Sequence, residues 1–375
     1  MPLRAIARVN LSAIERNAAR LRAGLSEGAE LCAVVKADGY GHGAVPAARA
    51  ALAGGAGSLA VATADEAAEL REGAIDAPVL VMGAISSDEL PVALAAAAQL
   101  VAWDQRFVDA VAREAGSDAP IGLHVKLDSG MGRLGTRDAD AALALAERIS
   151  ETGPTLRLMG AMTHFATADD DPEFMRAQLE TYREFVERLR PRWPELTMHA
   201  ANSAATLQSE ETHFGMVRCG IAIYGCDPMQ DDPAVHRLEP ALELRSYVAA
   251  VKPARPGDSA GYGRRFVADR ETWIATVPIG YADGVRRALT NNCDVLIGGR
   301  RYPLVGAVSM DNVTVDVGPE PQVAVGDAAT LIGRDGAERQ TAEDLAARIG
   351  TINYEILTGI SRRVPRTYHR DGRPA

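Results

Sequence analysis

Eight short runs of β-type residues alternate with Ala-rich stretches of helical periodicity between residues 30 and 225. The runs are Leu31–Lys36, Ser58–Thr63, Ala77–Gly83, Ala98–Asp104, Gly122–Gly130, Leu158–Phe165, Thr197–Ser203 and Met216–Gly225. Successive runs are far enough apart for one helix to connect parallel strands. The pattern therefore predicts an α/β fold, a (β/α)8 TIM-like barrel, with an open doubly wound sheet as the alternative.

The pattern changes after residue 235. Further strands without intervening helices are predicted, namely Ala241–Val251, Trp273–Ile279, Asp294–Ile297, Tyr302–Val305 and Asn312–Val317. Gly298 and Gly299 predict a two-residue hairpin turn, and Thr341 with Asp344 predicts the cap of one short helix. We expect two domains, a barrel of residues 1–235, whose first few residues join the other domain, and a C-terminal mainly-β domain of residues 236–375.

Two further helices are predicted in the N-terminal region. Ser12 and Glu15 have capping-box spacing at the start of an apolar helical repeat, so an opening helix is expected to lie against the barrel. The uncharged stretch Leu90–Trp103 is too short to cross a bilayer, which takes about 20 residues, and indicates a packed helix followed by a strand.

Charge and cysteine content restrict the partners and the compartment. The net charge of −10, with basic residues dispersed among acids, argues against nucleic acid. Cys32, Cys219, Cys226 and Cys293 lack metal-ligand spacing, so we expect reduced thiols and no metal. No signal segment or membrane span is predicted, and a cytoplasmic location is expected.

One segment points to chemistry. Val34–Gly43 places Lys36 at the end of an apolar strand, followed by a glycine-rich loop that in a barrel faces the active site. Burial favours the free amine of a lysine, which can form a Schiff base. The alternative is a strand-end lysine that extends to solvent.

The run Val35–Gly43 resembles the cofactor-attachment segment of the alanine racemase family, and further family segments follow in order along nearly the whole chain. The resemblance implies a barrel with a C-terminal β domain, pyridoxal 5′-phosphate (PLP) bound to Lys36, and interconversion of L- and D-alanine by two bases, supplying D-alanine for peptidoglycan. Whether the role is biosynthetic or catabolic stays open.

The segments after the fifth and sixth strands resemble the family's substrate-binding part. The resemblance implies that Arg133 reaches the cofactor's phenolic oxygen and the substrate carboxylate, and that Lys126 is carbamylated to position Arg133. An unmodified Lys126 held by local acids is the alternative. By resemblance, His164 packs beside the pyridine ring and hydrogen-bonds Arg218.

The last two barrel strands match the family's phosphate-binding part. Ser203, Gly220 and Ile221 are expected to hold the cofactor phosphate, with hydroxyls from Tyr40 and Tyr354.

Arg218 is expected to face the pyridine nitrogen. A guanidinium only donates hydrogen bonds and does not protonate that nitrogen, which weakens the cofactor as an electron sink.

The C-terminal segments imply the second base and a dimer. Ala260–Gly263 resembles the family segment that bears this base, which assigns it to Tyr262. Met310 is expected at the substrate carboxylate and Tyr281 at the substrate entrance. In the family these residues and Asp311 reach the barrel of the other subunit, so a homodimer is expected.

Two departures and three rival functions remain. Ala307 and Gly359 stand where many relatives carry basic residues, which leaves details of the β domain open. The rivals are a racemase of other or broader specificity, a decarboxylase of the same barrel type, and a non-catalytic PLP-binding protein. Arg218 counts against the decarboxylase, because that enzyme would carry an acid there, and Tyr262 with Met310 counts against the binding protein.

Overall fold

A computed structural model describes residues 4–115 and 120–375, which divide into two compact units. One unit is Ile14–Ile223, and the other combines the segment ending at Ala13 with Tyr224–Ala375. The division therefore lies at Ile223, ahead of the boundary expected at residue 235. The expectation for the first few residues concerns in part residues 1–3, which lie outside the described residues.

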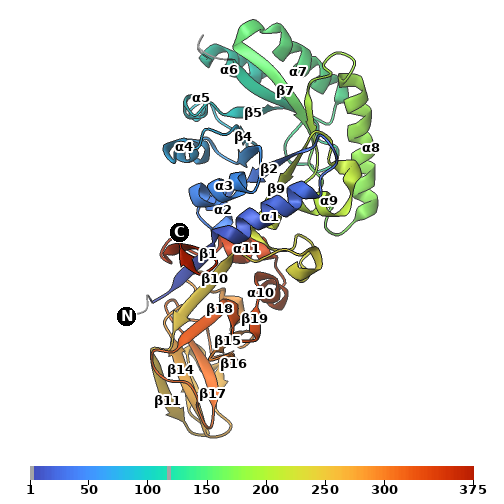
Figure 1. The fold of residues 1–375 in the computed structure, drawn as a ribbon. Helices are drawn as coiled ribbons and strands as arrows, with labels where there is room; N and C mark the ends of the chain where they lie inside the picture. The colour runs from blue at the N-terminus through green and yellow to red at the C-terminus, as the bar shows by residue number, and fades with distance from the viewer. Residues whose placement is uncertain (1–3, 116–119) are drawn as a thin grey trace. The chain divides into compact units, whose positions relative to one another are not determined.

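The unit Ile14–Ile223 is a closed barrel of parallel strands, which confirms the predicted fold and excludes the doubly wound sheet. Its strands are β2 (Glu30–Val34), β3 (Ser58–Val61), β4 (Val79–Val81), β5 (Gln99–Ala102), β6 (Ile121–Lys126), β7 (Leu156–Met162), β8 (Thr197–His199) and β9 (Met216–Cys219). Each pairs with the next, and β2 also pairs with β9, so the sheet has no edge (Figure 1).

All eight predicted runs overlap a strand, and every one extends beyond it at the C-terminal end. The first run was predicted to end at Lys36, whereas β2 ends at Val34. The strand ends although the next residue, Val35, is still apolar, and hydrophobicity alone does not report where a strand ends. The residues of each predicted run that lie beyond the observed strand belong to the loops at the carboxyl end of the barrel.

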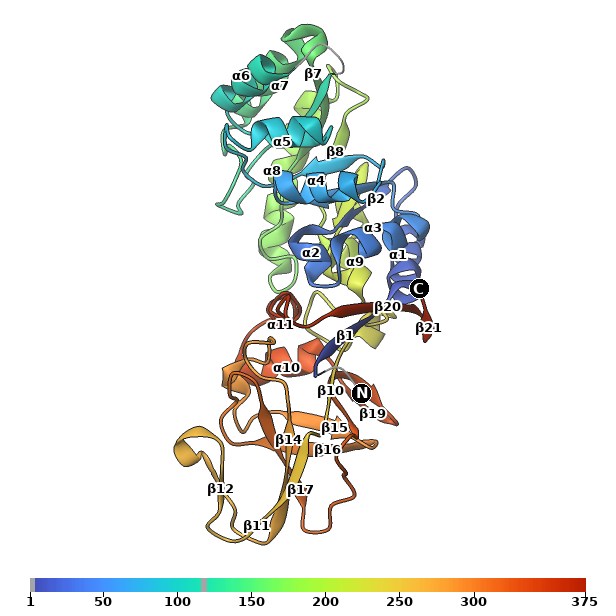
Figure 2. The same ribbon diagram turned by 90° about the vertical axis from the view of Figure 1, so that its left-hand side faces the viewer.

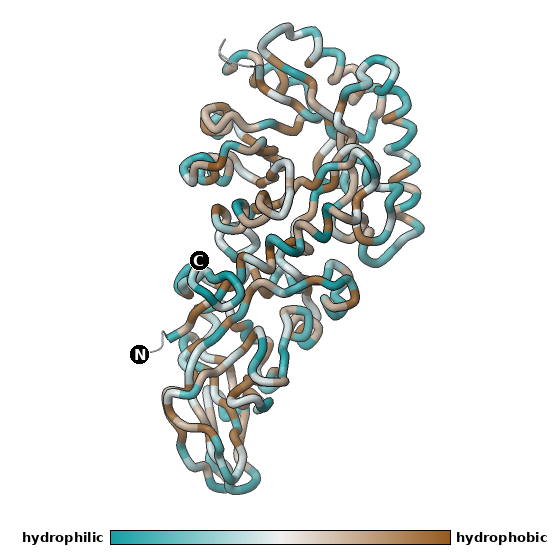
Figure 3. The backbone as a smooth tube through the Cα atoms, viewed as in Figure 1, coloured by the Kyte–Doolittle hydropathy of each residue, from teal (hydrophilic) through white to brown (hydrophobic). Residues whose placement is uncertain are grey.

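Helices connect the strands and cover the barrel, as Figures 1 and 2 show. They are α1 (Leu11–Ala23), α2 (Lys36–Tyr40), α3 (Ala44–Ala53), α4 (Ala64–Glu72), α5 (Leu90–Ala95), α6 (Gln105–Glu114), α7 (Ala139–Glu151), α8 (Pro172–Leu189) and α9 (Ser203–Gln208). The longest, α8, mixes hydrophilic and hydrophobic residues along its length (Figure 3), because one face packs inward. None of the described helices has the length and apolar character needed to span a membrane.

The opening helix is confirmed, but its predicted cap is wrong. Helix α1 begins at Leu11, so Ser12 lies inside it, and the Asn10 side chain accepts a hydrogen bond from the Ser12 amide at 3.2 Å. Asparagine is as good a cap as serine, and the serine-glutamate spacing placed the helix start too late. The predicted helix and strand within Leu90–Trp103 are confirmed as α5 and β5.

The second unit is built on a largely antiparallel sheet with strand order β11-β14-β17-β16-β15-β18-β10-β1-β20-β21, and β19 pairs with β18. The strands are β1 (Ile6–Asn10), β10 (Leu242–Tyr247), β11 (Ala250–Ala254), β14 (Thr272–Val277), β15 (Asp294–Ile297), β16 (Arg300–Val305), β17 (Val313–Gly318), β18 (Ala328–Asp335), β19 (Glu338–Gln340), β20 (Arg366–Arg370) and β21 (Arg373–Pro374). β12 (Ser259–Ala260) and β13 (Phe266–Val267) form a separate pair.

The mainly-β prediction is confirmed with two corrections. The predicted strand Ala241–Val251 is two strands, β10 and β11, which pair with different neighbours. An apolar run does not reveal this break, since apolar residues continue through it. Strand β18, which lies between β15 and β10, was not predicted.

Two local predictions in this unit are confirmed. Gly298 and Gly299 form the turn between β15 and β16, and both have positive φ, 60° and 76°, as the tight hairpin requires. Thr341 caps α10 (Ala342–Ile349) in a capping box with Asp344. A second short helix, α11 (Asn353–Thr358), was not predicted.

Candidate active site

The polar residues predicted for the barrel gather at the carboxyl ends of its strands. Lys36 follows β2, Lys126 ends β6, His164 lies just beyond β7, and Ser203 and Gly220 follow β8 and β9. The carboxyl ends of parallel barrel strands share one face, where the connecting loops form the active site. The closed barrel therefore brings these residues to the same end.

Lys36 opens a left-handed turn that the sequence did not predict. Ala37, Asp38, Gly39 and Tyr40 all have positive φ, at 53°, 53°, 58° and 52°. An L-residue in this region costs about 1 kcal/mol or more, so the three non-glycine residues Ala37, Asp38 and Tyr40 need external support.

Two carboxylates support the turn. Glu66 accepts a hydrogen bond from the Ala37 amide at 2.7 Å, and Asp38 accepts one from the Ala44 amide at 3.0 Å. The other oxygen of Glu66 accepts from the amides of Ala62 and Thr63 at 2.7 and 3.2 Å. Glu66 thereby ties the residue after Lys36 to the loop after β3.

Two lysines of the barrel have lowered pKa values. Burial lowers the pKa of Lys36, and the nearby charge of Arg133 adds to the effect while Glu66 opposes it. Burial also lowers the pKa of Lys126 to about 8, assisted by Arg218 and Arg133 and opposed by Asp128. Both amines are therefore more available as neutral nucleophiles than an exposed lysine.

Arg218 is buried beneath this end of the barrel. One of its terminal nitrogens lies 2.9 Å from Nδ1 of His199. The other donates to the carbonyl oxygens of Thr163 and Ala200 at 2.8 and 2.9 Å and lies 3.2 Å from Nδ1 of His164. Burial lowers the pKa of Arg218 to about 10, so the group keeps its charge at neutral pH. Its Nε is buried without a hydrogen-bond partner among the described residues.

His164 and His199 are neutral beside this cation. Burial first, and the charge of Arg218 next, hold the pKa of each imidazole well below its usual range. Since an arginine only donates, the Nδ1 atom of each ring is the acceptor and its proton is on Nε2.

Tyr40, Ser203 and Gly220 meet in a close-packed cradle. A Cβ atom at Gly220 would lie 2.4 Å from the Tyr40 hydroxyl oxygen, so a larger residue would displace that hydroxyl. Ser203 Oγ accepts from the amides of Gly220 at 3.0 Å and Ala222 at 3.4 Å. Ile221 is fully buried in the turn that follows. Asn202 caps the helix that begins at Ser203 by accepting from the Ala205 amide at 3.0 Å.

Arg133 is exposed in a glycine-rich loop after β6. The loop is ordered by Asp128, whose carboxylate accepts from the amides of Gly130 and Gly132 at 3.1 and 3.0 Å. Burial raises the pKa of Asp128, but these two amides and Arg137 outweigh it and lower the pKa overall. Asp128 is therefore ionised at neutral pH and holds the base of the loop that carries Arg133.

The remaining predicted residues lie in the second unit, where three side chains are exposed. The exposed fractions are 76% for Tyr262, 50% for Met310 and 43% for Tyr281. Gly261 lies against Ala307, and Gly280 lies against the carbonyls of Ser309 and Met310, so the three segments that carry these side chains are packed together. Exposed large apolar groups that lie together are typical of an interaction surface.

An ion-pair network lies behind this surface. Asp283 is fully buried and pairs with both Arg4 and Arg363, and Arg363 also pairs with Asp311. The Asp283 carboxylate accepts from the Gly280 amide at 2.9 Å. Asp311 therefore forms an ion pair with Arg363 within this unit.

Tyr354 lies half-buried in α11. It belongs to the second unit, whereas Tyr40 and Ser203 belong to the barrel. The departure at Gly359 has a local reason. A Cβ atom there would lie 2.0 Å from a terminal nitrogen of Arg286, whose guanidinium occupies that space. Ala307 is buried, and nothing around it explains the absence of a basic residue.

Sequence reasoning missed several residues of the site. Glu66 could have been found, since Thr63 and Glu66 have capping-box spacing and form that box on α4. Asp128, between Lys126 and Arg133, and Asp283, two residues after Tyr281, were assigned no role from the sequence. His199 carried no local signal, because its contact with Arg218 joins strands β8 and β9.

The chain matches known protein families along most of its length. A family profile described as "Alanine racemase, N-terminal domain" matches residues 9–228, and one described as "Alanine racemase, C-terminal domain" matches residues 241–368. An alanine racemase of Geobacillus kaustophilus is 40% identical over 368 residues, covering 97% of this chain and 94% of the relative. An alanine racemase of Thermobifida fusca is 43% identical over 376 residues, covering 96% and 97%.

Solved structures agree with these sequence matches. The alanine racemase of a D-cycloserine-producing Streptomyces lavendulae superposes with a TM-score of 0.93 at 35% identity and 98% coverage of both chains. The Bacillus anthracis alanine racemase with bound L-Ala-P has a TM-score of 0.91 at 38% identity, covering 100% of this chain and 97% of that chain.

Proposed function

The chain belongs to the alanine racemase family of isomerases and interconverts L- and D-alanine, and on this premise we propose that PLP attached to Lys36 is its cofactor. The observation that supports the proposal most strongly is that two residues occur at the same end of the barrel: Lys36, whose pKa is lowered, and Arg218, which is buried and charged.

The donor set of the barrel fits PLP. Lys36 has an amine suited to Schiff-base formation. Arg218 has a buried Nε donor that lacks an acceptor among the described residues, and a pyridine nitrogen would supply one. Tyr40, Ser203, Gly220 and Ile221 would hold the phosphate, and Tyr354 would add a hydroxyl.

Bound PLP supplies an electron sink that acidifies the Cα–H bond of an attached amino acid. Lys36 would hold the cofactor, and as a free amine it would remove or return the Cα proton of the substrate on one face. Arg218 donates a hydrogen bond but no proton, because its pKa of about 10 lies above neutral pH. Arg133 binds the substrate carboxylate, and His164 supports Arg218 at 3.2 Å.

Racemisation needs a second acid-base group on the opposite face of Cα, and we assign it to Tyr262. We propose that the β domain of a second copy of the chain provides it. The exposure of Tyr262, Met310 and Tyr281 supports this assignment, because an active-site base open to water needs a cover. Met310 would contact the substrate carboxylate, Tyr281 would line the entrance, and Asp311 would hold the Met310 loop through Arg363.

Lys126 has the properties needed for carbamylation. A pKa of about 8 leaves a neutral fraction that reacts with CO₂ at neutral pH. The resulting carbamate would replace a buried positive charge by a negative one, and it would orient Arg133 and offset the charge of Arg218. The product D-alanine fits a supply for peptidoglycan synthesis.

The first experiment is an absorbance spectrum of the purified protein before and after borohydride, followed by an assay for D-alanine formed from L-alanine. We expect a band at the edge of the visible range, fixation of the cofactor onto Lys36 by borohydride, and appearance of D-alanine. Lys36→Ala should lose the fixed cofactor. Absence of a reducible band from the wild-type protein would refute the cofactor assignment.

A further inference from the structure

A line of hydrogen-bonded side chains crosses the barrel away from Lys36. Arg218 meets His199 Nδ1 at 2.9 Å, and His199 Nε2 lies 2.9 Å from Nδ1 of His124. Nε2 of His124 lies 2.8 Å from the side-chain oxygen of Gln99. We refer to Arg218, His199, His124 and Gln99 as the barrel relay.

The donors and acceptors of the barrel relay have only one consistent order. Arg218 can only donate, so His199 Nδ1 accepts and its proton is on Nε2. His199 therefore donates to Nδ1 of His124, whose own proton is on Nε2 and is donated to Gln99. A proton added to either imidazole would place two donors face to face.

Burial keeps both histidines in this neutral state. Burial and then the charge of Arg218 lower the pKa of His124 to about 4. The groups whose charges act on His199 are Arg218, His124 and Lys126, and all three lower its pKa. Hydrogen bonds along the relay are therefore donated in the same direction, from Arg218 toward Gln99, over the whole pH range in which an amino-acid racemase would work.

The backbone leaves room for the relay. Strand β7 separates β6, which carries His124, from β8, which carries His199, and Gly160 of β7 pairs with both strands. A Cβ atom at Gly160 would lie 2.6 Å from His124 Nδ1 and 2.3 Å from the Thr197 carbonyl oxygen. A side chain there would block the contact between the two imidazoles.

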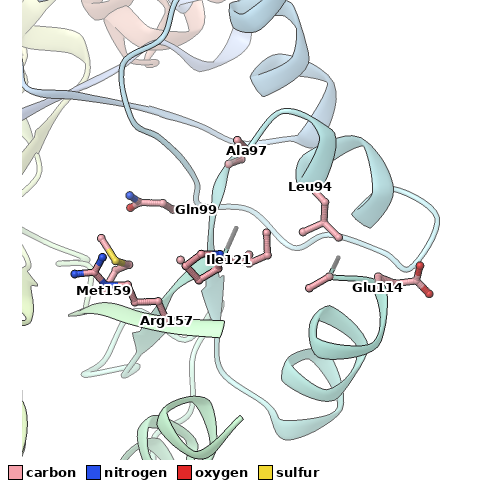
Figure 4. Close-up of a pocket in the computed structure, with 11 residues that line it drawn as sticks. Leu94, Ala97, Gln99, Glu114, Ile121, Arg157 and Met159 are labelled. Carbon is pink, nitrogen blue, oxygen red and sulfur yellow. The ribbon is translucent and has the colours of Figure 1, made fainter. Parts of the chain in front are cut away.

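Gln99 is the far end of the barrel relay. It is the first residue of β5 and lines a pocket of about 430 Å³ together with Ile121, Arg157 and Met159. Figure 4 shows the Gln99 side chain directed away from Leu94 and Glu114, toward the side where Met159 and Arg157 lie. The relay thus begins at the carboxyl end of the barrel and ends at the opening where strands β5 and β6 start.

We propose that His124 and Gln99 are positioning residues of the racemase, which act through His199 to fix the direction and the charge of the Arg218 guanidinium. Their place in the reaction rests on the proposed cofactor, since Arg218 is the group that would face its pyridine nitrogen. Gln99 supplies the last acceptor, and without it the Nε2–H of His124 loses its partner in the relay. The relay also gives Arg218 a neutral acceptor in place of a carboxylate, so its charge stays available to a ligand.

The first test uses solid-state ¹⁵N NMR of the holoenzyme labelled in histidine, with His124→Gln to assign the His124 signals. We expect His124 and His199 to be neutral Nε2–H tautomers from about pH 6 to 9, well above the pKa of His124. An Nδ1–H tautomer, or a His124 that titrates in this range, would overturn the proposal. This readout needs no activity, so it stands if the cofactor proposal fails.

The second test removes the end of the relay with Gln99→Met, which keeps the length of the side chain. We expect the His124 and His199 signals to shift, the visible absorbance band to move, and kcat to fall about three- to tenfold with little change in KM, the worth of one net hydrogen bond. The matched control is Met159→Leu, which alters the same pocket wall but removes no hydrogen-bonding group of the relay.

A third test compares two substitutions of His124, in order to separate loss of the hydrogen bond from loss of the fold. His124→Leu leaves the His199 donor without an acceptor, whereas His124→Gln offers both an acceptor and a donor. The glutamine variant should recover most of the kcat lost in the leucine variant. Two results would overturn the proposal: an equal loss of kcat in both His124 variants, or a Gln99→Met enzyme that matches Met159→Leu in spectrum and kcat. Either would mean that these side chains only pack in the barrel core and do not position Arg218.

Discussion

Arg218 is a buried cation whose hydrogen-bond partners are carbonyl oxygens and neutral imidazoles. A buried charge usually has an oppositely charged partner, because desolvation costs several kcal/mol. Here the compensation comes from dipoles that do not neutralise the charge. The guanidinium therefore presents a fixed positive field to whatever binds above it.

Tyr262→Phe isolates the second base. The variant should keep the cofactor band, because Lys36 is untouched, and lose racemisation by about a thousandfold or more, since one face of Cα then has no acid-base group. Exchange of the Cα proton with deuterated solvent on the Lys36 face separates this effect from loss of binding. Racemisation at the wild-type rate would remove Tyr262 from the mechanism, and Tyr302→Phe in the same unit is a control.

Carbamylation of Lys126 should depend on pH. Burial lowers the pKa from 10.5 to about 8, so the neutral amine that attacks CO₂ becomes more abundant as the pH rises through 8. At constant dissolved ¹³CO₂, the ¹³C NMR signal of the carbamate should grow from pH 6.5 to 8.5 and be absent in Lys126→Ala. No signal at any pH would favour the unmodified lysine.

At the scale of elements, the left-handed turn at Lys36–Tyr40 shows where sequence reasoning stops. The strand before it was predicted from its apolar residues, and the three glycines indicated an unusual loop. However, Ala37, Asp38 and Tyr40 also adopt positive φ, which their residue types do not announce. The conformation depends on Glu66 and Asp38, and only the fold brings Glu66 to the turn.

Glu66→Gln tests this support. The glutamine keeps one acceptor oxygen, but its NH2 group would face either the Ala37 amide or the amides of Ala62 and Thr63, so we expect a loss of about 1–3 kcal/mol in unfolding free energy. Removal of the charge would also lower the pKa of Lys36, because Glu66 raises it. Urea unfolding and the pH dependence of cofactor attachment measure the two effects. Glu72→Gln, exposed on the same helix, should change neither.

At the same scale the β domain was predicted less well than the barrel. Barrel strands are buried on both faces and are separated by helices, so each appears as an isolated apolar run. The strands of the second sheet follow one another with short turns, and β10 and β11 merged into one predicted strand. Contacts such as Arg218 with His199 are set by the barrel closure and leave no trace in local sequence.

At the scale of the molecule, a shared active site would make activity depend on two copies of the chain. Neither Lys36→Ala nor Tyr262→Phe should racemise alanine alone. A mixed dimer of the two has one site with both residues intact, so random mixing should restore about a quarter of wild-type activity. Lys36→Ala mixed with the double variant Lys36→Ala/Tyr262→Phe is the control and should stay inactive. No recovery in the first mixture would place both residues in one subunit.

The sheet of the second unit contains β1 from the beginning of the chain between β10 and β20 from much later in it. During synthesis, β1 therefore leaves the ribosome long before either partner exists. The barrel residues are synthesised directly after β1, so the barrel can fold while β1 is still unpaired. Nascent chains that stop before Arg366 would expose one edge of β1 to other chains, which makes late truncations a route to aggregation.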